Sequence, residues 1–260
     1  MDPNCTAETL HFGERFSSPT PDANNQNKLQ KSPQSIRDAR AVDAILNQAR
    51  SKQIRTPKSW KGLVDHCPED CYIDLEFIND TLFGSPHPTM IYMIGIGYKD
   101  SKNKWQKVEF IADKLTYEAE EKILRQWINW VSKRPSTPRC FHWSAAEPSQ
   151  FKKAYERHGL NPANVSFVDL MKIFIESPLT VKGCYNFKLK NITKALHSHH
   201  LIKTNYDDSE CNNGADAMLL CWQHYGFIGQ DVDYEVSPMT QIIEYNRIDT
   251  KVLEDIHSLF

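Results

Sequence analysis

The order of the predicted strands and helices constrains the fold of this chain most strongly. Three strand-like segments, at 71–77, 89–98 and 104–112, follow one another, and the turn KDSKN joins the second to the third. Consecutive strands joined by short turns pair antiparallel. Segments that alternate between helix and strand come next. A chain with this order belongs to the α/β class and forms a mixed sheet with helices on its faces.

The later segments show helical and strand-like patterns in turn. Thr116 is in position to cap a helix, and the glutamates behind it suit the positive end of the helix dipole. We expect, in order, a helix at 116–133, a strand at 139–143, a helix at 148–159, a strand that turns helical within 165–174, and helices at 186–196, 214–226 and 240–260.

The first sixty residues differ in composition from the rest. Residues 1–34 are rich in Asn, Ser, Pro and Thr without hydrophobic periodicity, so we expect a disordered tail. Apolar residues then recur every three or four positions, which predicts a basic amphipathic helix and linker at 35–60. Residues 28–61 carry nine basic and two acidic side chains, an excess that suits either a polyanionic partner or a solvated linker helix. The folded domain is predicted at 61–260.

Composition favours one soluble domain. The chain has 260 residues, 40% of them hydrophobic, which is enough for one sizeable core. It has no run of about 18 apolar residues and no signal-peptide pattern, so we expect an intracellular, soluble protein without a membrane partner. The seven cysteines include no C-x-x-C pair, which favours reduced thiols. The segment HCPEDC at 66–71 lacks a second cysteine pair, so no zinc is expected on it.

Two carboxylates share one face of the first predicted strand. In CYIDLEF, Asp74 and Glu76 are two positions apart, and side chains two apart on a strand point the same way. Two anions roughly 7 Å apart near a sheet interior repel each other and lose hydration unless a cation lies beside them. A divalent metal ion would meet both needs. The alternative is an edge strand with a solvated acidic face.

A second acidic pattern lies in the last predicted helix. In IIEYNRIDTKVLEDI, Tyr245 and Asp249 are four positions apart, which places the phenol and the carboxylate on one helical face. Ile242, Val252 and Ile256 share that face, so we expect it to turn toward the sheet. An inward aspartate would need a partner; the alternative is an exposed acid on an ordinary helix.

Together these motifs resemble the ribonuclease H-like superfamily, in particular the DEDDy branch of DnaQ-like 3'-5' exonucleases. The amino-acid sequences of the segments most resemble the predicted RecB-family, YprB-like nuclease group. The shared features are, in order, the D-x-E strand, the strand IYMIGIGY, the segment FHWSAAEPSQF, the helix YNFKLKNITKAL, the helix NGADAMLL and the terminal YNRID. The resemblance covers about residues 70–260. It implies a five-stranded mixed sheet, with three antiparallel strands followed by helix-strand-helix-strand, flanked by helices.

The resemblance also implies a reaction and its cofactors. The reaction would be hydrolysis of phosphodiester bonds with two Mg²⁺ or Mn²⁺ ions, which clamp the attacking and leaving oxygens of an in-line displacement. Asp74 would bridge both ions. Glu76 and Asp249 would complete the site that activates water. Tyr245 would orient that water.

The fourth carboxylate departs from the family pattern. Most DnaQ-like enzymes offer an aspartate after the fourth strand, but here CFHWSAAEPSQF supplies only Glu147. We take Glu147 as the fourth metal ligand and His142 as a neighbour of the site; the alternative for Glu147 is an acid that merely favours the helix dipole. Asp169, in SFVDLMKIF, is the rival ligand. Its own alternatives are a helix cap or an acceptor behind the metal ligands.

Basic and aromatic residues alternate near position 188. Lys188 and Lys190 interleave with Tyr185 and Phe187, which suits stacked single-stranded nucleic acid, although core packing is the more common role of such rings. His142 is a further candidate for nucleic-acid contact. We expect a metal-dependent 3'-5' exonuclease, with DNA favoured over RNA; an endonucleolytic cut would use the same carboxylates. The alternatives are a catalytically inactive nucleic-acid-binding module and an accessory domain of a larger replication or repair assembly.

Overall fold

The computed structural model describes residues 66–79, 89–177, 179, 181–207, 209, 211, 213–229 and 236–259. The tail predicted at 1–34 and the basic helix and linker predicted at 35–60 lie outside these residues. Both stay predictions, as does the start of the folded domain at 61. Within the described part of the chain, no helix has both the length and the apolar character needed to cross a membrane.

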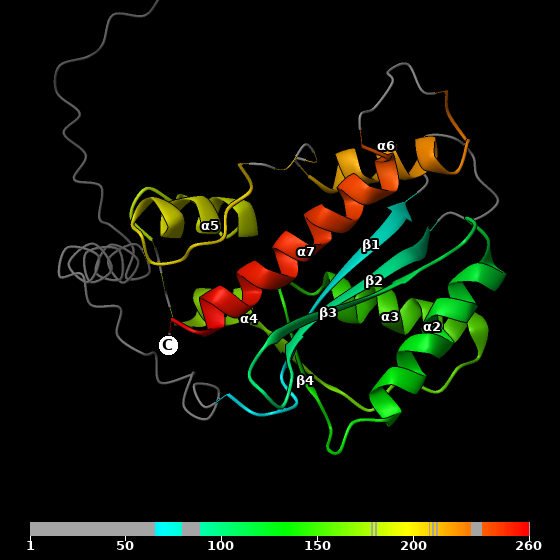
Figure 1. The fold of residues 1–260 in the computed structure, drawn as a ribbon, viewed down its shortest axis with the longest axis horizontal. Helices are drawn as coiled ribbons and strands as arrows, with labels where there is room; N and C mark the ends of the chain where they lie inside the picture. Colours follow the sequence, from blue (N-terminus) through cyan, green and yellow to red (C-terminus); the bar gives the residue numbers. More distant parts are fainter. Residues whose placement is uncertain are drawn as a thin grey trace, which may run out of the picture. The chain divides into compact units, whose positions relative to one another are not determined.

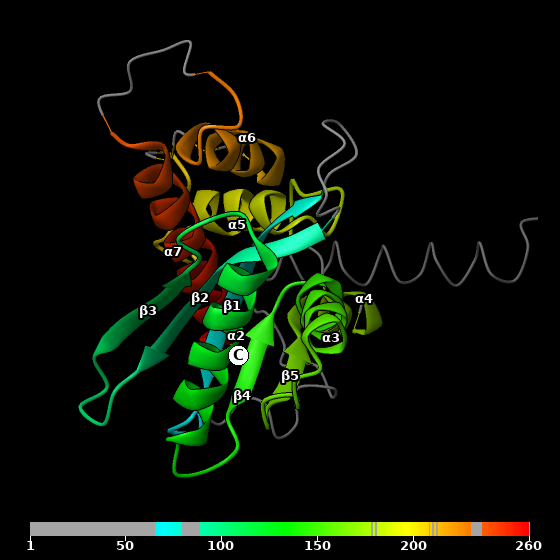
Figure 2. The ribbon, with the colours of Figure 1, turned by 90° about the vertical axis from the view of Figure 1, so that its right-hand side faces the viewer.

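Five strands form one mixed sheet in the order β3-β2-β1-β4-β5 (Figures 1 and 2). Strand β1 pairs antiparallel with β2, and β2 with β3, whereas β1 pairs parallel with β4, and β4 with β5. The predicted α/β class and five-stranded mixed sheet are confirmed. The strands are β1 (Cys71–Asn79), β2 (Thr89–Lys99), β3 (Trp105–Ile111), β4 (Arg139–His142) and β5 (Ser166–Asp169).

The described helices lie close to their predicted ranges. Thr116 caps α2 as expected, since its side chain accepts a hydrogen bond from the Ala119 amide at 3.3 Å. Helix α3 begins two residues before the predicted 148, because Pro148 is tolerated in a first turn whose amides need no helical partner. The helices are α2 (Tyr117–Ser132), α3 (Ala146–His158), α4 (Leu170–Glu176), α5 (Leu189–Ser198), α6 (Gly214–His224) and α7 (Pro238–His257).

The helices cover both faces of the sheet. Helix α7 lies across one face, and α2 and α3 cover the other (Figures 1 and 2). On the α7 face, Tyr72 of β1 packs with apolar side chains of α4, α5 and α7, among them Phe174, Ile192, Val252 and Ile256. On the other face, β1 contributes Ile73 and Leu75 to a core that includes Ile123, Trp127 and Phe151. Alternation along β1 therefore sends its even-numbered residues toward α7.

A buried carboxylate joins the two helices on the far face to the sheet. Glu120 of α2 is fully buried, and its Oε1 accepts a hydrogen bond from the Ile91 amide of β2 at 2.7 Å. Arg157 of α3 donates to both of its oxygens at 2.9 Å, and His158 lies 2.8 Å from Oε2. A buried charge that is paired in this way is costly to leave alone, by about 3–5 kcal/mol. Glu120 thus holds α2, α3 and β2 together.

Helix α7 approaches the sheet closely at a glycine. Gly95 of β2 lies opposite Asp74 of β1 in the antiparallel ladder. A Cβ atom on Gly95 would lie 1.5 Å from Oδ1 of Asn246, so no other residue leaves room for the Asn246 side chain. A glycine inside a strand often marks such an approach. Gly95 therefore sets how near α7 can lie to β1.

Gly95→Ala is expected to lower the free energy of unfolding by at least about 2 kcal/mol, because the added methyl overlaps the Asn246 amide. Gly214→Ala is the matched control: a Cβ there meets nothing within 4 Å, so a change within about 0.5 kcal/mol is expected. Urea unfolding followed by circular dichroism measures both. Equal stability of the two variants would show that α7 does not depend on Gly95.

Candidate functional site

Three carboxylates from opposite ends of the domain sequence meet between β1 and α7. One oxygen each of Asp74, Glu76 and Asp249 lies within 4.8 Å of the others. Asp74 and Glu76 share the β1 face that α7 covers, and Asp249 points from α7 back toward that face. Glu76 and Asp249 are buried, whereas Asp74 keeps part of its surface accessible. We call these three residues the carboxylate cluster.

The pairing of β1 with β2 is irregular where β1 carries Asp74 and Glu76. The β1–β2 register shifts between Glu76 and Phe77, because Glu76 pairs with Met93 and Phe77 pairs with Ile91. One extra residue, Tyr92, is therefore accommodated in β2. Such bulges bend and twist a strand and are common beside active sites.

Burial and mutual repulsion raise the pKa values of the three carboxylates in the cluster. Burial, followed by the charges of Asp249 and Glu76, raises the pKa of Asp74 well above its usual range. Burial and then Asp249 raise the pKa of Glu76 to about 8. Burial raises the pKa of Asp249 to about 6, although a hydrogen bond from Tyr206 and the charge of Lys190 oppose the shift. Full ionisation at neutral pH therefore calls for compensating positive charge.

Two polar side chains that the sequence did not single out hold the cluster in place. The Asn246 amide donates to Oδ2 of Asp74 at 2.7 Å and to its backbone carbonyl at 3.2 Å. The Tyr206 hydroxyl donates to Oδ1 of Asp249. Asn246 had a detectable pattern, since it lies three positions before Asp249 on one helical face. Tyr206 follows α5 in an irregular segment, and no pattern pointed to it.

Lys190 and Tyr245 line the same region. The Lys190 ammonium lies 4.3 Å from the Tyr245 ring centroid and 4.6 Å from that of Tyr206, a cation–π arrangement, and donates to the Cys211 carbonyl at 3.4 Å. Burial lowers the pKa of Lys190, opposed first by the charge of Asp249. Burial raises the pKa of Tyr245, as do the charges of Asp249 and Asp74. Lys188, by contrast, is exposed at the start of α5.

Glu147 lies beside the cluster rather than within the 4.8 Å group. It is buried at the start of α3, and its charge raises the pKa of both Asp74 and Asp249. Its Oε2 lies 3.2 Å from Nδ1 of buried His142. Neither of these two atoms makes a hydrogen bond of good geometry to the described residues. Burial raises the pKa of Glu147, and the contact with His142 opposes the shift.

Asp169 caps a helix. Its Oδ1 accepts a hydrogen bond from the Lys172 amide, in the first turn of α4, at 3.1 Å and one from the Ser144 amide at 3.0 Å. Ser144 has a φ of 86°, a left-handed conformation that is unusual for a residue with a side chain. Asp169 therefore stabilises the loop that leads into α3 and Glu147.

The donor set fits a hard divalent cation. The carboxylate cluster offers oxygen atoms alone, which is what Mg²⁺ and Mn²⁺ prefer. Beside it lies a buried Glu147 oxygen that makes no hydrogen bond of good geometry to the residues the structure describes, and buried polar atoms normally have partners. Asp74, Glu76 and Asp249 could hold such an ion, with Glu147 as an additional ligand.

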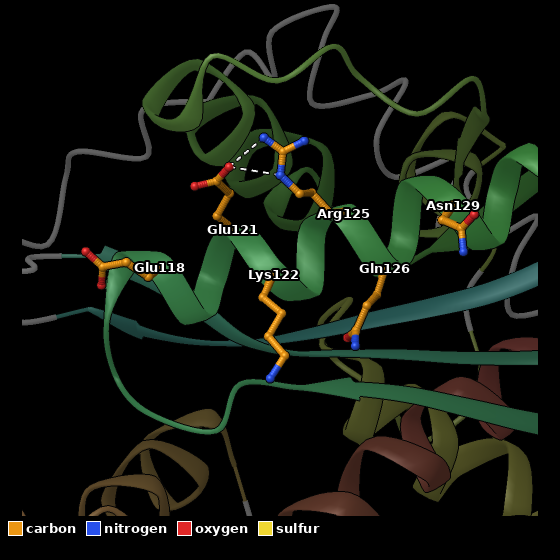
Figure 3. Close-up of a pocket in the computed structure, with 6 residues that line it drawn as sticks. All are labelled: Glu118, Glu121, Lys122, Arg125, Gln126 and Asn129. Atoms are coloured by element: carbon orange, nitrogen blue, oxygen red, sulfur yellow. Dashed lines mark hydrogen bonds and ion pairs between the residues drawn. The ribbon is translucent and has the colours of Figure 1, made fainter.

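A shallow hollow on the outer face of α2 has different chemistry. Its side chains belong to one solvated helical face, and the Glu121 and Arg125 side chains pair with each other (Figure 3). Acidic, basic and amide groups alternate there without converging on a point. The lining residues are Glu118, Glu121, Lys122, Arg125, Gln126 and Asn129.

Comparisons with known proteins found similar solved structures and a matching family. Among solved structures, the family B DNA polymerase from the hyperthermophilic archaeon Pyrobaculum calidifontis is similar, with a TM-score of 0.50 and 12% identity, over 72% of this chain and 24% of the polymerase. E. coli Exonuclease I in complex with a dT13 oligonucleotide matches over 48% of this chain and 35% of its own, with a TM-score of 0.35 and 15% identity. A search of curated proteins found no match.

This chain thus corresponds to only 24% of the polymerase's length. At this level of identity, the likeness concerns the fold. A family model described as the RNase H superfamily matches residues 71–260, well over half of the sequence. The chain therefore belongs to the RNase H superfamily.

Proposed function

We propose that this protein is a metal-dependent nuclease that hydrolyses phosphodiester bonds, acting as a 3'-5' exonuclease on DNA. The observation that carries the proposal is the convergence of Asp74, Glu76 and Asp249 within 4.8 Å. The neighbouring Tyr245, and Glu147 in place of the usual aspartate, give a set of four carboxylates and a tyrosine that resembles the DEDDy branch. The amino-acid sequences of the shared segments favour the RecB-family, YprB-like group.

The residues of the site have different roles in the proposed reaction. When bound, two Mg²⁺ or Mn²⁺ ions would supply the positive charge that stabilises the reacting phosphate and activates water. Asp74, Glu76 and Asp249 present their oxygens toward one point, and Glu147 adds a fourth carboxylate. Tyr245 keeps its proton, because burial and the nearby carboxylates raise its pKa. Its hydroxyl can therefore donate a hydrogen bond that orients water or a phosphate oxygen.

Two residues act by positioning Glu147. His142 is 2% exposed and lies against Glu147, so we assign it to holding that carboxylate, in place of the nucleic-acid contact that the sequence suggested. Asp169 holds the Ser144 loop and caps α4. We therefore place Glu147, and not Asp169, among the metal ligands.

The segment that carries α5 is suited to bind the substrate. Its lysines outnumber its acids among the described residues, and Tyr185 is 96% exposed. Exposed lysines attract the phosphate backbone, and an exposed ring offers a surface on which a base can stack. Lys190 extends the basic side chains to the carboxylate cluster. The lysines are Lys182, Lys188, Lys190, Lys194 and Lys203.

Asp74→Asn and Asp249→Asn are each expected to reduce digestion of labelled oligonucleotides by more than about 100-fold, because outer partners of metal ligands alone cost 10–100-fold. The assay uses single-stranded and duplex DNA and RNA, labelled at the 3' or the 5' end, with Mg²⁺ or Mn²⁺. Glu147→Gln should lose activity, whereas Asp169→Asn should retain more of it. Glu121→Gln on α2 is the control.

Asp74→Asn digestion at the wild-type rate would disprove the catalytic assignment. An active Glu147→Gln beside an inactive Asp169→Asn would exchange their roles. A wild-type protein that binds oligonucleotides without cleaving them, with either metal, would instead be a nucleic-acid-binding module or an accessory domain.

The metal-free protein should become less stable as the pH rises from about 5 to 8. Carboxylates whose pKa is raised by folding stabilise the protonated folded state, and that contribution is lost as the pH rises through the folded-state values of about 6 and 8. Asp74→Asn relieves the repulsion, so its Tm advantage over wild type in EDTA should grow over this range. Mg²⁺ should raise the wild-type Tm more at pH 8 than at pH 6. A Tm difference that does not vary with pH would contradict the account.

Tyr185→Ala is expected to weaken binding of a fluorescent single-stranded oligonucleotide by ~1–3 kcal/mol, because one stacking surface is lost. Tyr185→Phe keeps the ring and should bind as wild type does. Phe227→Ala removes another exposed ring, which is 60% accessible and follows α6, and should have no effect. Fluorescence anisotropy in EDTA measures binding without cleavage. Equal losses for Tyr185→Ala and Phe227→Ala would remove Tyr185 from the interface.

A further inference from the structure

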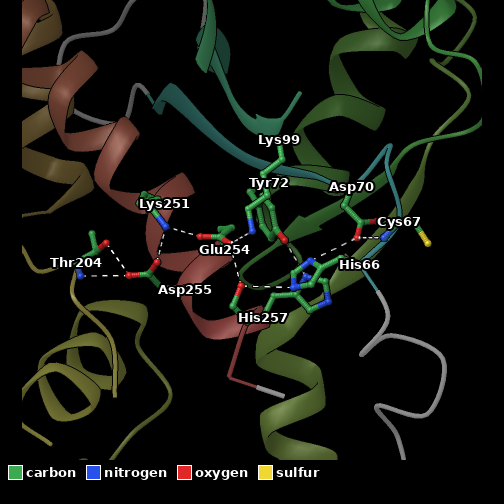
Figure 4. Close-up of polar contacts among 11 residues, drawn as sticks. His66, Cys67, Asp70, Tyr72, Lys99, Thr204, Lys251, Glu254, Asp255 and His257 are labelled. Atoms are coloured by element: carbon green, nitrogen blue, oxygen red, sulfur yellow. Dashed lines mark hydrogen bonds and ion pairs between the residues drawn. The ribbon is translucent and has the colours of Figure 1, made fainter. Parts of the chain in front are cut away.

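A second group of metal-ligand side chains lies at the other end of β1 and α7. His66 and Asp70 precede β1, and His257 is the last residue of α7. One ligand atom from each of the three lies within 4.8 Å of the others. Figure 4 shows the two imidazoles and the Asp70 carboxylate turned toward one another. We call these three residues the histidine cluster.

We propose that the histidine cluster is a binding site for a borderline divalent cation of the Zn²⁺ type. Two imidazoles and one carboxylate are a common ligand set for such ions, whereas Mg²⁺ prefers oxygen ligands alone. The two imidazole ring centroids are 4.4 Å apart. A neutral imidazole binds a metal ion through a ring nitrogen.

Neighbouring groups hold the ligands in place. Arg139 clamps Asp70 with two hydrogen bonds, of 2.6 Å to Oδ1 and 2.7 Å to Oδ2. The Tyr72 hydroxyl lies 2.8 Å from Nδ1 of His257, and the buried His257 ring stacks on Phe141 at 4.2 Å. Metal-binding histidines and carboxylates usually have such hydrogen-bonding partners behind them. Two of the three ligands are therefore fixed before any cation binds.

The site is open on one side. His66 and Asp70 line a cavity of about 250 Å³ together with Cys67, Tyr72 and other residues. Figure 4 shows the Cys67 thiol pointing away from the imidazoles. Water from the cavity is therefore the natural fourth ligand, which gives the four-coordinate geometry that Zn²⁺ favours.

The histidine cluster is separate from the carboxylate cluster, although the same two elements carry both. Asp70 and Asp74 are four residues apart along an extended chain, which is roughly 13 Å. Asp249 and His257 are eight residues apart on α7, which is about 12 Å. A cation at the histidine cluster would join the chain entering β1 to the end of α7. This inference does not depend on nuclease activity.

The test uses the full chain carrying Asp74→Asn, stripped of metal, so that the carboxylate cluster is already disabled. Titration with Zn²⁺ is expected to raise the Tm and to saturate at one equivalent, whereas Mg²⁺ should not compete. Co²⁺ bound at the histidine cluster should give the visible absorption bands of a four-coordinate ion. His66→Ala, at a partly exposed position, should weaken Zn²⁺ binding at least tenfold, since even outer partners cost about 10–100-fold.

Two further variants separate binding from folding. His224→Ala removes an exposed histidine at the end of α6 and should leave Zn²⁺ affinity unchanged. Tyr72→Phe keeps the ring but loses the hydroxyl behind His257, and should weaken binding by about 10–100-fold. Unchanged Zn²⁺ affinity on adding His66→Ala, or Asp74→Asn protein that binds Co²⁺ without these bands, overturns the proposal. Equal losses in His66→Ala and His224→Ala would likewise overturn it.

Discussion

The close contact between α7 and β1 is the constraint on which the rest of the structure depends. Asn246 of α7 reaches over Gly95 and donates two hydrogen bonds to Asp74 of β1, one to its side chain and one to its backbone carbonyl. These contacts set the height of α7 above the sheet and the direction in which its inner face points. Asp249 then falls beside Asp74 and Glu76, and the last turn of α7 falls beside Tyr72.

The face of the sheet under α7 is electrostatically unfavourable without added positive charge. Three carboxylates lie together where water is mostly excluded, and their raised pKa values record the cost. The Lys190 ammonium and the Tyr206 hydroxyl offset part of it. The opposite face has no such conflict among the described residues, because Glu120 is matched by Arg157, His158 and the Ile91 amide. The buried charges are therefore balanced on the face that α2 and α3 cover and unbalanced on the face that α7 covers.

Local periodicity predicted the α/β class and the two separate residue pairs of the site, whereas the family resemblance implied the five-stranded sheet and the meeting of the two pairs. Spacing by two placed Asp74 with Glu76, and spacing by four placed Tyr245 with Asp249, because these patterns follow from strand and helix geometry alone. Contacts between distant segments carry no such pattern. Tyr206 reaches Asp249 from an irregular segment, and the Ser144 amide reaches Asp169 from 25 positions away. The segment HCPEDC looked incomplete as a metal site because His257 lies far from it in the sequence. His257 follows its hydrogen-bonding partner Tyr72 by 185 positions.

Helix α7 links the two clusters through its rotational phase. One residue inserted after Thr250 would turn everything beyond it by about 100°, which swings His257 away from Tyr72 while Asp249 stays in place. Four inserted residues would complete slightly more than one full turn and bring the ring back to nearly the same azimuth, about 6 Å further along the axis. The number of residues in α7 therefore fixes the direction of His257 relative to Asp249. Changing that number would move His257 and leave the carboxylate cluster in place.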